Sequence, residues 1–156
     1  MTVKSASMPL TLERLWQFSL QYYGIRQVKN ACLELQNHFR GNVNLLLLLK
    51  WLDEQQIAFQ EQDWHQVETC VGRTEALLHN FRQLRRQYKQ HLPDSLYRES
   101  LQFELQLEKQ QQSDLVACVN SLGLISPTTT PLTLSYCRQL GAERLYPIFS
   151  NAKVSS

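Results

Sequence analysis

Glycine and proline are scarce in this 156-residue chain, which has five of each. Between Leu10 and Leu122 the only such residues are Gly24, Gly41, Gly72 and Pro93. Because these two residue types most often interrupt helices, their scarcity predicts long helices. The chain has the usual length of one domain, and its 43% hydrophobic content is enough for one core. We therefore expect a single all-α domain.

Long apolar runs and a strong excess of one charge are also missing. The longest apolar run, Leu45 to Leu49, is far shorter than the roughly 20 residues of a membrane helix. The first ten residues have no apolar segment or cleavage site typical of a secretory signal. A formal net charge of +2 is too small to indicate a polyanion partner by itself. We expect a cytoplasmic protein without a membrane span.

The cysteines lack the spacing of a metal site or a redox pair. The four residues are Cys32, Cys70, Cys118 and Cys137. Their wide separation, with no CxxC pair, predicts buried reduced thiols, and this fits the cytoplasm.

Hydrophobic periodicity predicts about five helices between residues 11 and 120. Thr11 can cap the first helix and Gly24 can end it, whereas the second ends before Gly41. The third begins at Asn42, and its leucines cover every face, which is typical of a helix surrounded by protein. A buried strand would show the same pattern, but leucine rather than valine or isoleucine favours a helix.

The fourth predicted helix is the longest and runs from a capping box of Asp63 and Gln66 to about His91. It carries two heptad seams. One seam holds Val67, Thr74, Phe81 and Tyr88, and the other holds Cys70, Leu77, Leu84 and His91. The pattern favours packing along a bundle over a self-associating coiled coil, because threonine and histidine would weaken such a seam.

A fifth helix is predicted from Pro93 to about Val119. Its leucines and Phe103 alternate with polar residues over part of this range, which would also suit a strand. The absence of β-branched residues between Pro93 and Leu115 favours a helix.

Three segments are expected: a flexible N-terminus at 1–10, a helical domain at 11–120, and a C-terminal tail at 121–156. The tail contains Pro127, Pro131 and Pro147 and few charges. We expect it to be flexible or loosely docked and partly disordered, with short helices at 134–140 or 144–149 able to dock on the body.

No familiar catalytic motif is present: there is no phosphate-binding loop, nucleophile elbow or HExxH sequence. Two Glu/His pairs, Glu34 with His38 and Glu75 with His79, have a spacing of four rather than the spacing of three found in di-iron helical bundles. We expect no catalytic residue, cofactor or metal. The chain is interpreted as non-enzymatic, although an enzyme that binds a small molecule or metal stays open as an alternative.

The most distinctive charged feature is a basic ridge on one side of the fourth helix, formed by Arg82, Arg85, Arg86 and Lys89. This ridge can contact the phosphates of RNA or DNA, or an anionic protein surface. It can also be a solvated helix end, where cations complement the helix dipole. Most aromatic residues are expected in the core, but Tyr23 and Trp64 could line a groove.

Several short blocks of the sequence resemble one family. These blocks are Leu15–Leu20 with Tyr22–Tyr23, Ala31–Gln36, Asn42–Leu47 and Trp51–Leu52, with weaker likeness at Leu84–Arg86 and Leu96–Tyr97. Together they resemble small hypothetical proteins of proteobacteria, described only as a domain of unknown function. The likeness covers roughly Leu12 to Glu108 and implies a bacterial cytoplasmic setting, with the basic ridge as part of the domain. It implies no activity, cofactor or catalytic residue.

The leading hypothesis is a non-enzymatic helical interaction module that binds a protein partner through the basic ridge. The alternative is direct binding of RNA or DNA through the same residues. Both hypotheses depend on what the ridge contacts in the folded protein.

Overall fold

The computed structural model describes residues 10–127 and 130–154, which contain seven α-helices and no strand. The helices are α1 (Leu12–Tyr23), α2 (Arg26–Phe39), α3 (Val43–Glu54), α4 (Trp64–Tyr88), α5 (Asp94–Asn120), α6 (Leu132–Leu140) and α7 (Tyr146–Asn151), with short 3₁₀ turns η1 (Glu61–Asp63) and η2 (Glu143–Leu145). The all-α class is confirmed. The expected number of about five helices was too low, because the C-terminal segment adds two. Within the described residues, no helix combines the length and the apolar character needed to cross a membrane.

The ends of the first helices follow the sequence signals. The Thr11 hydroxyl accepts a hydrogen bond from the Arg14 N–H, and the Asn42 carboxamide oxygen accepts one from Leu45 N–H. Arg40 closes α2 in the left-handed conformation, with φ of 58°, so that the chain turns sharply into α3. The capping box expected at Asp63 is absent, because this side chain makes no capping hydrogen bond and η1 leads into α4 instead.

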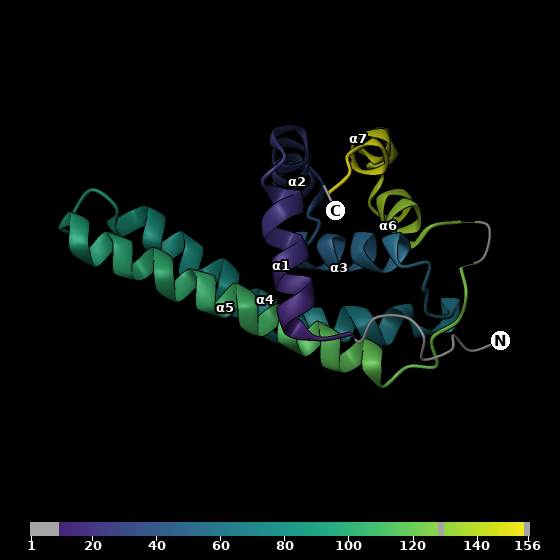
Figure 1. The fold of residues 1–156 in the computed structure, drawn as a ribbon. Coiled ribbons are helices and arrows are strands. Elements are labelled where there is room, and N and C mark those ends of the chain that lie inside the picture. Colours follow the sequence, from purple (N-terminus) through teal and green to yellow (C-terminus); the bar gives the residue numbers. More distant parts are fainter. Residues whose placement is uncertain (1–9, 128–129, 155–156) are drawn as a thin grey trace.

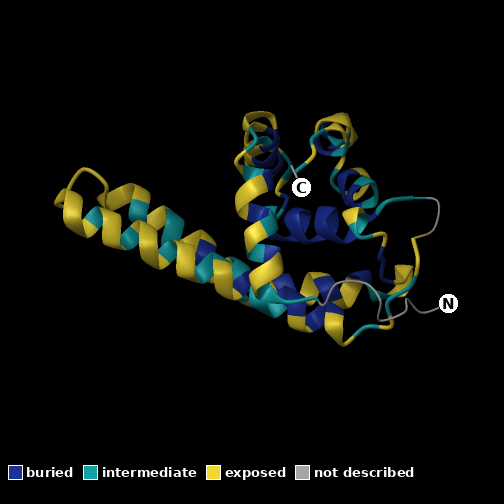
Figure 2. Ribbon diagram, in the orientation of Figure 1, coloured by how far each residue is buried: buried dark blue, intermediate teal, exposed yellow. Residues whose placement is uncertain are grey.

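Helix α3 lies at the centre of the body. Every residue from Asn44 to Leu52 is buried, as Figure 2 shows in dark blue. Helices α1, α2, α5 and α6 pack around it. The all-round leucine pattern therefore belongs to a central helix and not to a strand.

Helices α4 and α5 form a long antiparallel hairpin. One end lies under the body, and the other end projects well beyond the remaining helices (Figure 1). At the base, the segment before α4 and the segment after α5 meet at Ala58 and Ile125. The backbones of these two residues exchange a pair of N–H···O hydrogen bonds, both of 2.8 Å. We call the projecting part of the hairpin, residues 77–107, the arm.

The contact between α4 and α5 corrects one of the two predicted heptad seams. Leu77 and Leu84, expected in the seam, are 55% and 48% exposed, whereas Leu78 is fully buried. The reason lies on α5, which presents Glu104 to α4. Arg85 pairs with this carboxylate, so α4 is rotated to bring Arg85 rather than Leu84 toward α5.

The segment predicted as a loosely docked tail is instead part of the core over residues 130–154. Leu132, Cys137 and Phe149 are buried there, and the Tyr22 hydroxyl donates a 2.7 Å hydrogen bond to the Phe149 carbonyl. The Asp53 carboxylate caps α6 by accepting hydrogen bonds from the N–H groups at its start. The expectations for residues 1–9, 128–129 and 155–156 lie outside the described residues.

Candidate functional site

The basic ridge divides into two halves in the folded protein. Arg82 and Arg85 have side chains only 15% exposed, and both form ion pairs with glutamates of α5. Arg82 reaches Glu108 at 2.9 Å and Glu104 at 3.6 Å. The hydrogen bond to Glu104 raises the pKa of Arg85. Half of the ridge therefore holds the arm together.

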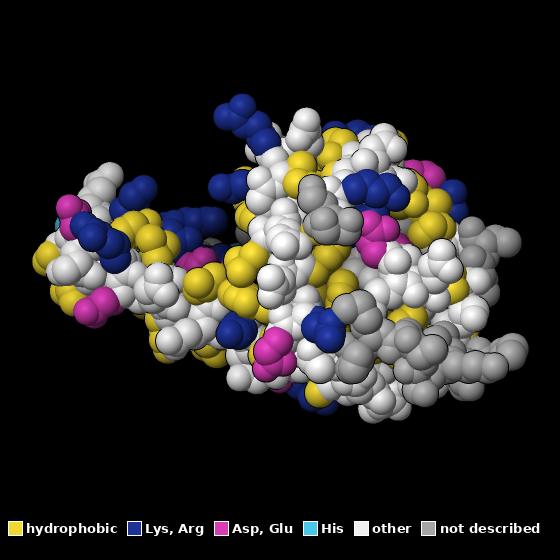
Figure 3. Space-filling view, in the orientation of Figure 1, with side chains coloured by type: hydrophobic (Ala, Val, Ile, Leu, Met, Phe, Trp, Pro, Cys, Tyr) yellow, Lys and Arg dark blue, Asp and Glu magenta, His cyan; other side chains and the backbone are white. Residues whose placement is uncertain are grey.

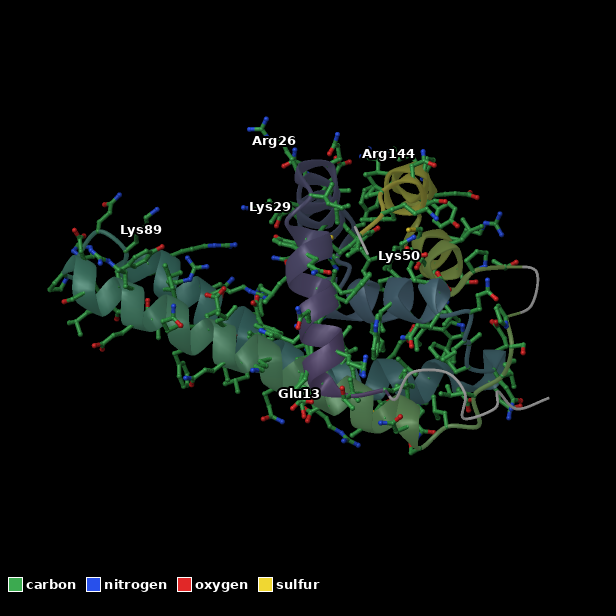
Figure 4. The ribbon with its side chains drawn as sticks, viewed as in Figure 1. Glu13, Arg26, Lys29, Lys50, Lys89 and Arg144 are labelled. Carbon is green, nitrogen blue, oxygen red and sulfur yellow. The ribbon has the colours of Figure 1, made fainter. Side chains whose placement is uncertain are left out.

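The other half of the ridge is exposed. Arg86 and Lys89 both face solvent, and the Lys89 ammonium lies 5.8 Å from the centre of the Tyr97 ring. Figure 3 shows Lys and Arg side chains along the edge of the arm that borders a hollow against the body. Across this hollow, the Lys29 side chain of α2 extends toward the arm (Figure 4). Cations thus come from both sides of the hollow.

A cavity of about 400 Å³ lies at the bottom of this hollow. Helices α1, α2 and α3 and the hairpin α4–α5 all contribute side chains to it. Its residues are Trp16, Ser19, Leu20, Tyr23, Gly24, Lys29, Gln36, Gly41, Asn42, Val43, Asn44, Leu47, Glu75, Arg82, Leu105, Glu108, Gln111 and Gln112. A volume of this size and convergence from several helices are typical of a small-molecule site.

Side-chain amides form the floor of the cavity. Gln111 and Gln112 are each only 1% exposed, and Asn44 is 8% exposed. Asn44 donates a 2.9 Å hydrogen bond to the Gln111 carbonyl oxygen, and Gln112 donates to Asn44 at 3.2 Å and to the Ser19 hydroxyl at 3.0 Å. These bonds join α1, α3 and α5 through neutral groups that act as donors and acceptors.

Asn42 and Glu75 extend the amide network to α4. The Asn42 side-chain N–H₂ group donates to the Glu75 carboxylate and to the Gln111 oxygen, while Gln111 donates to the Val71 carbonyl at 3.1 Å. The backbone N–H of Asn42 in turn donates to the Tyr136 hydroxyl at 2.8 Å, so α6 supports the same floor. A buried network connected in this way fixes the cavity's shape.

The two aromatic residues proposed for a groove lie in different places. Tyr23 lines the cavity, where burial raises the pKa of its hydroxyl and the nearby Cys32 and Glu108 add to the effect. Trp64 is 7% exposed and packs edge-on against Phe59 in the core. The Trp16 ring also lines the cavity, and the Lys109 ammonium lies 5.5 Å from the centre of this ring.

The opposite side of the arm carries an unpaired apolar surface, which we call the apolar flank. It consists of Leu77, Leu84 and Tyr88 on α4 and Leu96 and Phe103 on α5, each 48–55% exposed. The tilted contact of Phe81 with Phe103, at 5.1 Å between ring centres, joins the two helices along this side. At 100° per residue, the flank and the ridge fall on different sides of α4.

The described residues contain no group of three or more His, Cys, Asp or Glu side chains placed to hold a metal ion. All four cysteines are buried and unpaired. Burial raises the pKa of Cys32 and of Cys118 to about 12, so these thiols stay protonated near neutral pH and are poor nucleophiles. Among the described residues, the cavity is the place where polar groups of several helices converge.

The amide floor was not foreseen from the sequence. A weak signal exists in Gln111 and Gln112 before the apolar residues of α5, and in Asn44, which interrupts the apolar run of α3. Arg82, predicted as part of the basic ridge, and Tyr23, predicted to line a groove, both line this cavity.

A family model described as a protein of unknown function, DUF2390, matches residues 14–115. This range contains every residue that lines the cavity and the whole arm. Neither the curated proteins nor the solved structures gave a match.

Proposed function

The chain belongs to the family of proteins of unknown function called DUF2390, and we propose that it is a non-enzymatic helical interaction module whose arm binds a protein partner. One observation carries this proposal: the apolar flank is exposed on a part of the hairpin that projects from the body. A cytoplasmic setting belongs to the same proposal and is supported by four buried, unpaired thiols.

The size of the apolar flank supports a protein partner. Five large apolar side chains that are about half exposed present roughly 500 Å² of surface, which is at the upper end for a patch on a monomer. A partner that covers the flank and its polar edge would bury an area near that of a standard interface, about 800 Å² on each side. The flank has the composition of an interface centre, since it combines leucine with Tyr88 and Phe103.

The shape of the flank supports a helical partner. Leu77, Leu84 and Tyr88 form an apolar row along α4. Leu96 and Phe103 form a second apolar row along α5. Two antiparallel helices with apolar rows on the same side form a groove in which a third helix can pack. We therefore expect an amphipathic helix of the partner to bind along the arm, with apolar residues at a spacing of three and four.

The test is affinity purification from the source cells with nuclease present. The paired substitutions Leu84→Gln and Phe103→Gln should remove the main partner, because they place polar amides at the centre of the flank. The matched control is Leu33→Gln on α2, which changes a leucine that is 38% exposed but lies outside the arm. Light scattering of the purified protein identifies the case in which the partner is a second copy.

A partner that both the Leu84→Gln, Phe103→Gln protein and the Leu33→Gln control retain would exclude the flank as the binding surface. Far-ultraviolet circular dichroism should be the same for all variants, since the replaced side chains are about half exposed.

Direct binding of RNA or DNA is a second candidate, favoured by the exposed Arg86 and Lys89 on the arm. Arg86→Gln with Lys89→Gln tests it cleanly, because replacement of Arg82 or Arg85 would also break ion pairs inside the arm. This candidate expects nucleic-acid affinity to fall steeply with salt and the double variant to flatten that dependence. A salt-independent affinity, unchanged in the variant, would exclude it.

A further inference from the structure

The arm has little core of its own. Of residues 77–107, Leu78 alone is fully buried. The helices of the arm are otherwise joined by Arg–Glu ion pairs and by the contact of Phe81 with Phe103. Helical segments of about 12–15 residues are marginal in water by themselves, because most helical stability comes from packing of an apolar face. The arm therefore needs a lasting cover on its apolar flank.

The flank can supply that cover to a second copy of itself. Because α4 and α5 are antiparallel and Phe81 contacts Phe103, Tyr88 lies level with Leu96, and Leu84 lies within one turn of Phe103. A twofold axis parallel to the arm brings α4 of one copy against α5 of the other and keeps these levels. Each apolar row then meets the apolar row of the other helix across the axis.

Charges beside the flank are complementary in the same arrangement. At 100° per residue, Arg73 of α4 and Asp114 of α5 continue the flank toward the base of the hairpin. Gln111, three residues before Asp114, donates to Glu75, two residues after Arg73, so Arg73 and Asp114 lie at nearly the same level. Among the described residues, neither side chain is part of an ion pair. The parallel axis brings Arg73 near Asp114 of the second copy.

Antiparallel arms would place like charges together. An axis perpendicular to the arm would set Leu96 of one copy against Phe103 of the other. Glu99 lies midway between these two residues on α5 and is exposed, so it would meet Glu99 of the second copy. With parallel arms, Glu99 faces the neutral Gln87 of α4 instead. The charges thus favour the parallel arrangement.

The body leaves room for a second copy on the flank. Arg82 and Leu105 line the cavity between the hairpin and the body. Leu84 and Phe103 are each two residues away from them, or about 200° around the helix. The flank therefore faces away from the body, which lies on one side of the hairpin in Figure 1.

We propose that the apolar flank binds the flank of a second copy, so that two parallel arms form a four-helix bundle. This inference rests on the proposed function, because it names the partner of the arm. From Arg73 to Lys89, α4 is about 25 Å long, and two packed helices are about 20 Å wide. A face of roughly 500 Å² in plan carries a larger accessible area, near the about 800 Å² per partner of a standard interface.

Sedimentation velocity of the full chain tests the second copy. At roughly 10–100 μM the wild type should sediment with twice the chain mass of 18.3 kDa. Leu84→Glu should raise the dissociation constant at least about 100-fold, because it places a carboxylate against an aromatic residue on each side of the axis. The control Leu105→Glu changes a leucine that is 41% exposed on the body side of the arm and should leave the dimer intact. A monomeric wild type, or a dimer that survives Leu84→Glu, would overturn the proposal.

Charge reversal tests the parallel arrangement with variants that spare the apolar residues. Arg73→Glu and Asp114→Arg should each weaken the dimer about five- to ten-fold, and the double variant should restore it to within about two-fold. Full affinity in both single variants, or a double variant as weak as the single ones, would contradict parallel arms.

Affinity purification separates this inference from the proposed function. A monomeric chain whose flank variant Leu84→Gln, Phe103→Gln loses a different protein would overturn the second copy and leave the flank as a binding surface. Flank variants that keep both the dimer and every co-purified protein would contradict both proposals.

Discussion

Single residues at the turn between α2 and α3 decide whether the cavity floor can form. Gly41 follows Arg40 in its left-handed conformation and is itself buried, directly before Asn42 of the amide network. A Cβ atom added at Gly41 would lie 2.6 Å from Leu35 Cγ and 2.8 Å from Leu140 Cδ1. Glycine is required here by packing against two helices.

We expect Gly41→Ala to lower the free energy of unfolding by about 1–3 kcal/mol, because the methyl group overpacks this corner. Gly72→Ala is the matched control. No atom lies within 4 Å of a Cβ added there, and Gly72 is within α4, so this change should stabilise by up to about 1 kcal/mol. Chemical denaturation of the two variants measures both values, and equal effects would contradict the packing argument.

Asp53 gives a residue-scale prediction about pH. Burial raises the pKa of its carboxyl group, although hydrogen bonds from Thr133 and Leu132 act in the opposite direction. A carboxyl with a raised folded-state pKa binds its proton more tightly in the folded than in the unfolded protein. Its contribution to stability is therefore greatest in acid and is lost as pH rises through the folded pKa.

Asp53→Asn removes this titration. The free energy of unfolding of the wild type, relative to Asp53→Asn, should decrease as pH rises from about 4 toward neutrality. Urea denaturation at a series of pH values measures this difference. A difference that grows with pH would mean that the α6 N–H groups outweigh burial and depress the pKa.

At the scale of elements, the arm is held together by fewer apolar contacts than its heptads suggest. Glu104 and Glu108 of α5 face Arg82 and Arg85 of α4, so charged groups occupy the interface. The leucines of the apolar flank are therefore exposed instead of lying at this interface. The interface of the arm thus includes Arg–Glu ion pairs beside Leu78 and the Phe81–Phe103 contact, while its outer side carries exposed apolar residues.

Neighbouring leucines of α4 test this arrangement. Leu78→Ala should lower the free energy of unfolding by about 2–5 kcal/mol, because Leu78 is fully buried. Leu77→Ala should change it by less than about 1 kcal/mol, since Leu77 is 55% exposed. Thermal unfolding followed by circular dichroism distinguishes the two. The predicted seam would require the opposite order.

Local signals made the first three helices predictable, and long-range pairing limited the prediction of α4. Thr11, Gly24 and Asn42 act on groups within four residues, so their roles can be read along the chain. The partner of Arg82 is 26 residues away on α5, and no pattern within α4 contains it. The rotation of α4 therefore could not be derived from its own heptads.

At the scale of the whole molecule, the core is completed by the last helices. Cys137, Ala142 and Phe149 are fully buried among residues from α1 to α5, and Asp53 of α3 caps α6. The proline-rich and threonine-rich composition around residues 127–131 indicated a tail, whereas only three-dimensional packing shows that the following apolar residues have a place in the core. The amide floor was hidden for the same reason, since its members come from four helices.

A fragment of residues 10–115, close to the range matched by the family model, should not fold cooperatively. It lacks Val119, Cys137 and Phe149, which are fully buried, and would expose the surfaces of α2 and α3 that they cover. The fragment 10–154 is the control. Differential scanning calorimetry should show a cooperative transition for the control alone, and a sharp transition for 10–115 would contradict the prediction.

The hydrogen-bonded pair Ala58 and Ile125 has a consequence for how this fold can vary. The pair holds the start of α4 and the end of α5 next to each other, so the hairpin is attached to the body at one fixed place. Removal of seven residues from each helix beyond the cavity would shorten the arm by about 10 Å and keep the helical phase at its base. The reach of the molecule is thus an adjustable length, set by matched insertions or deletions in two helices while the core and cavity keep their dimensions.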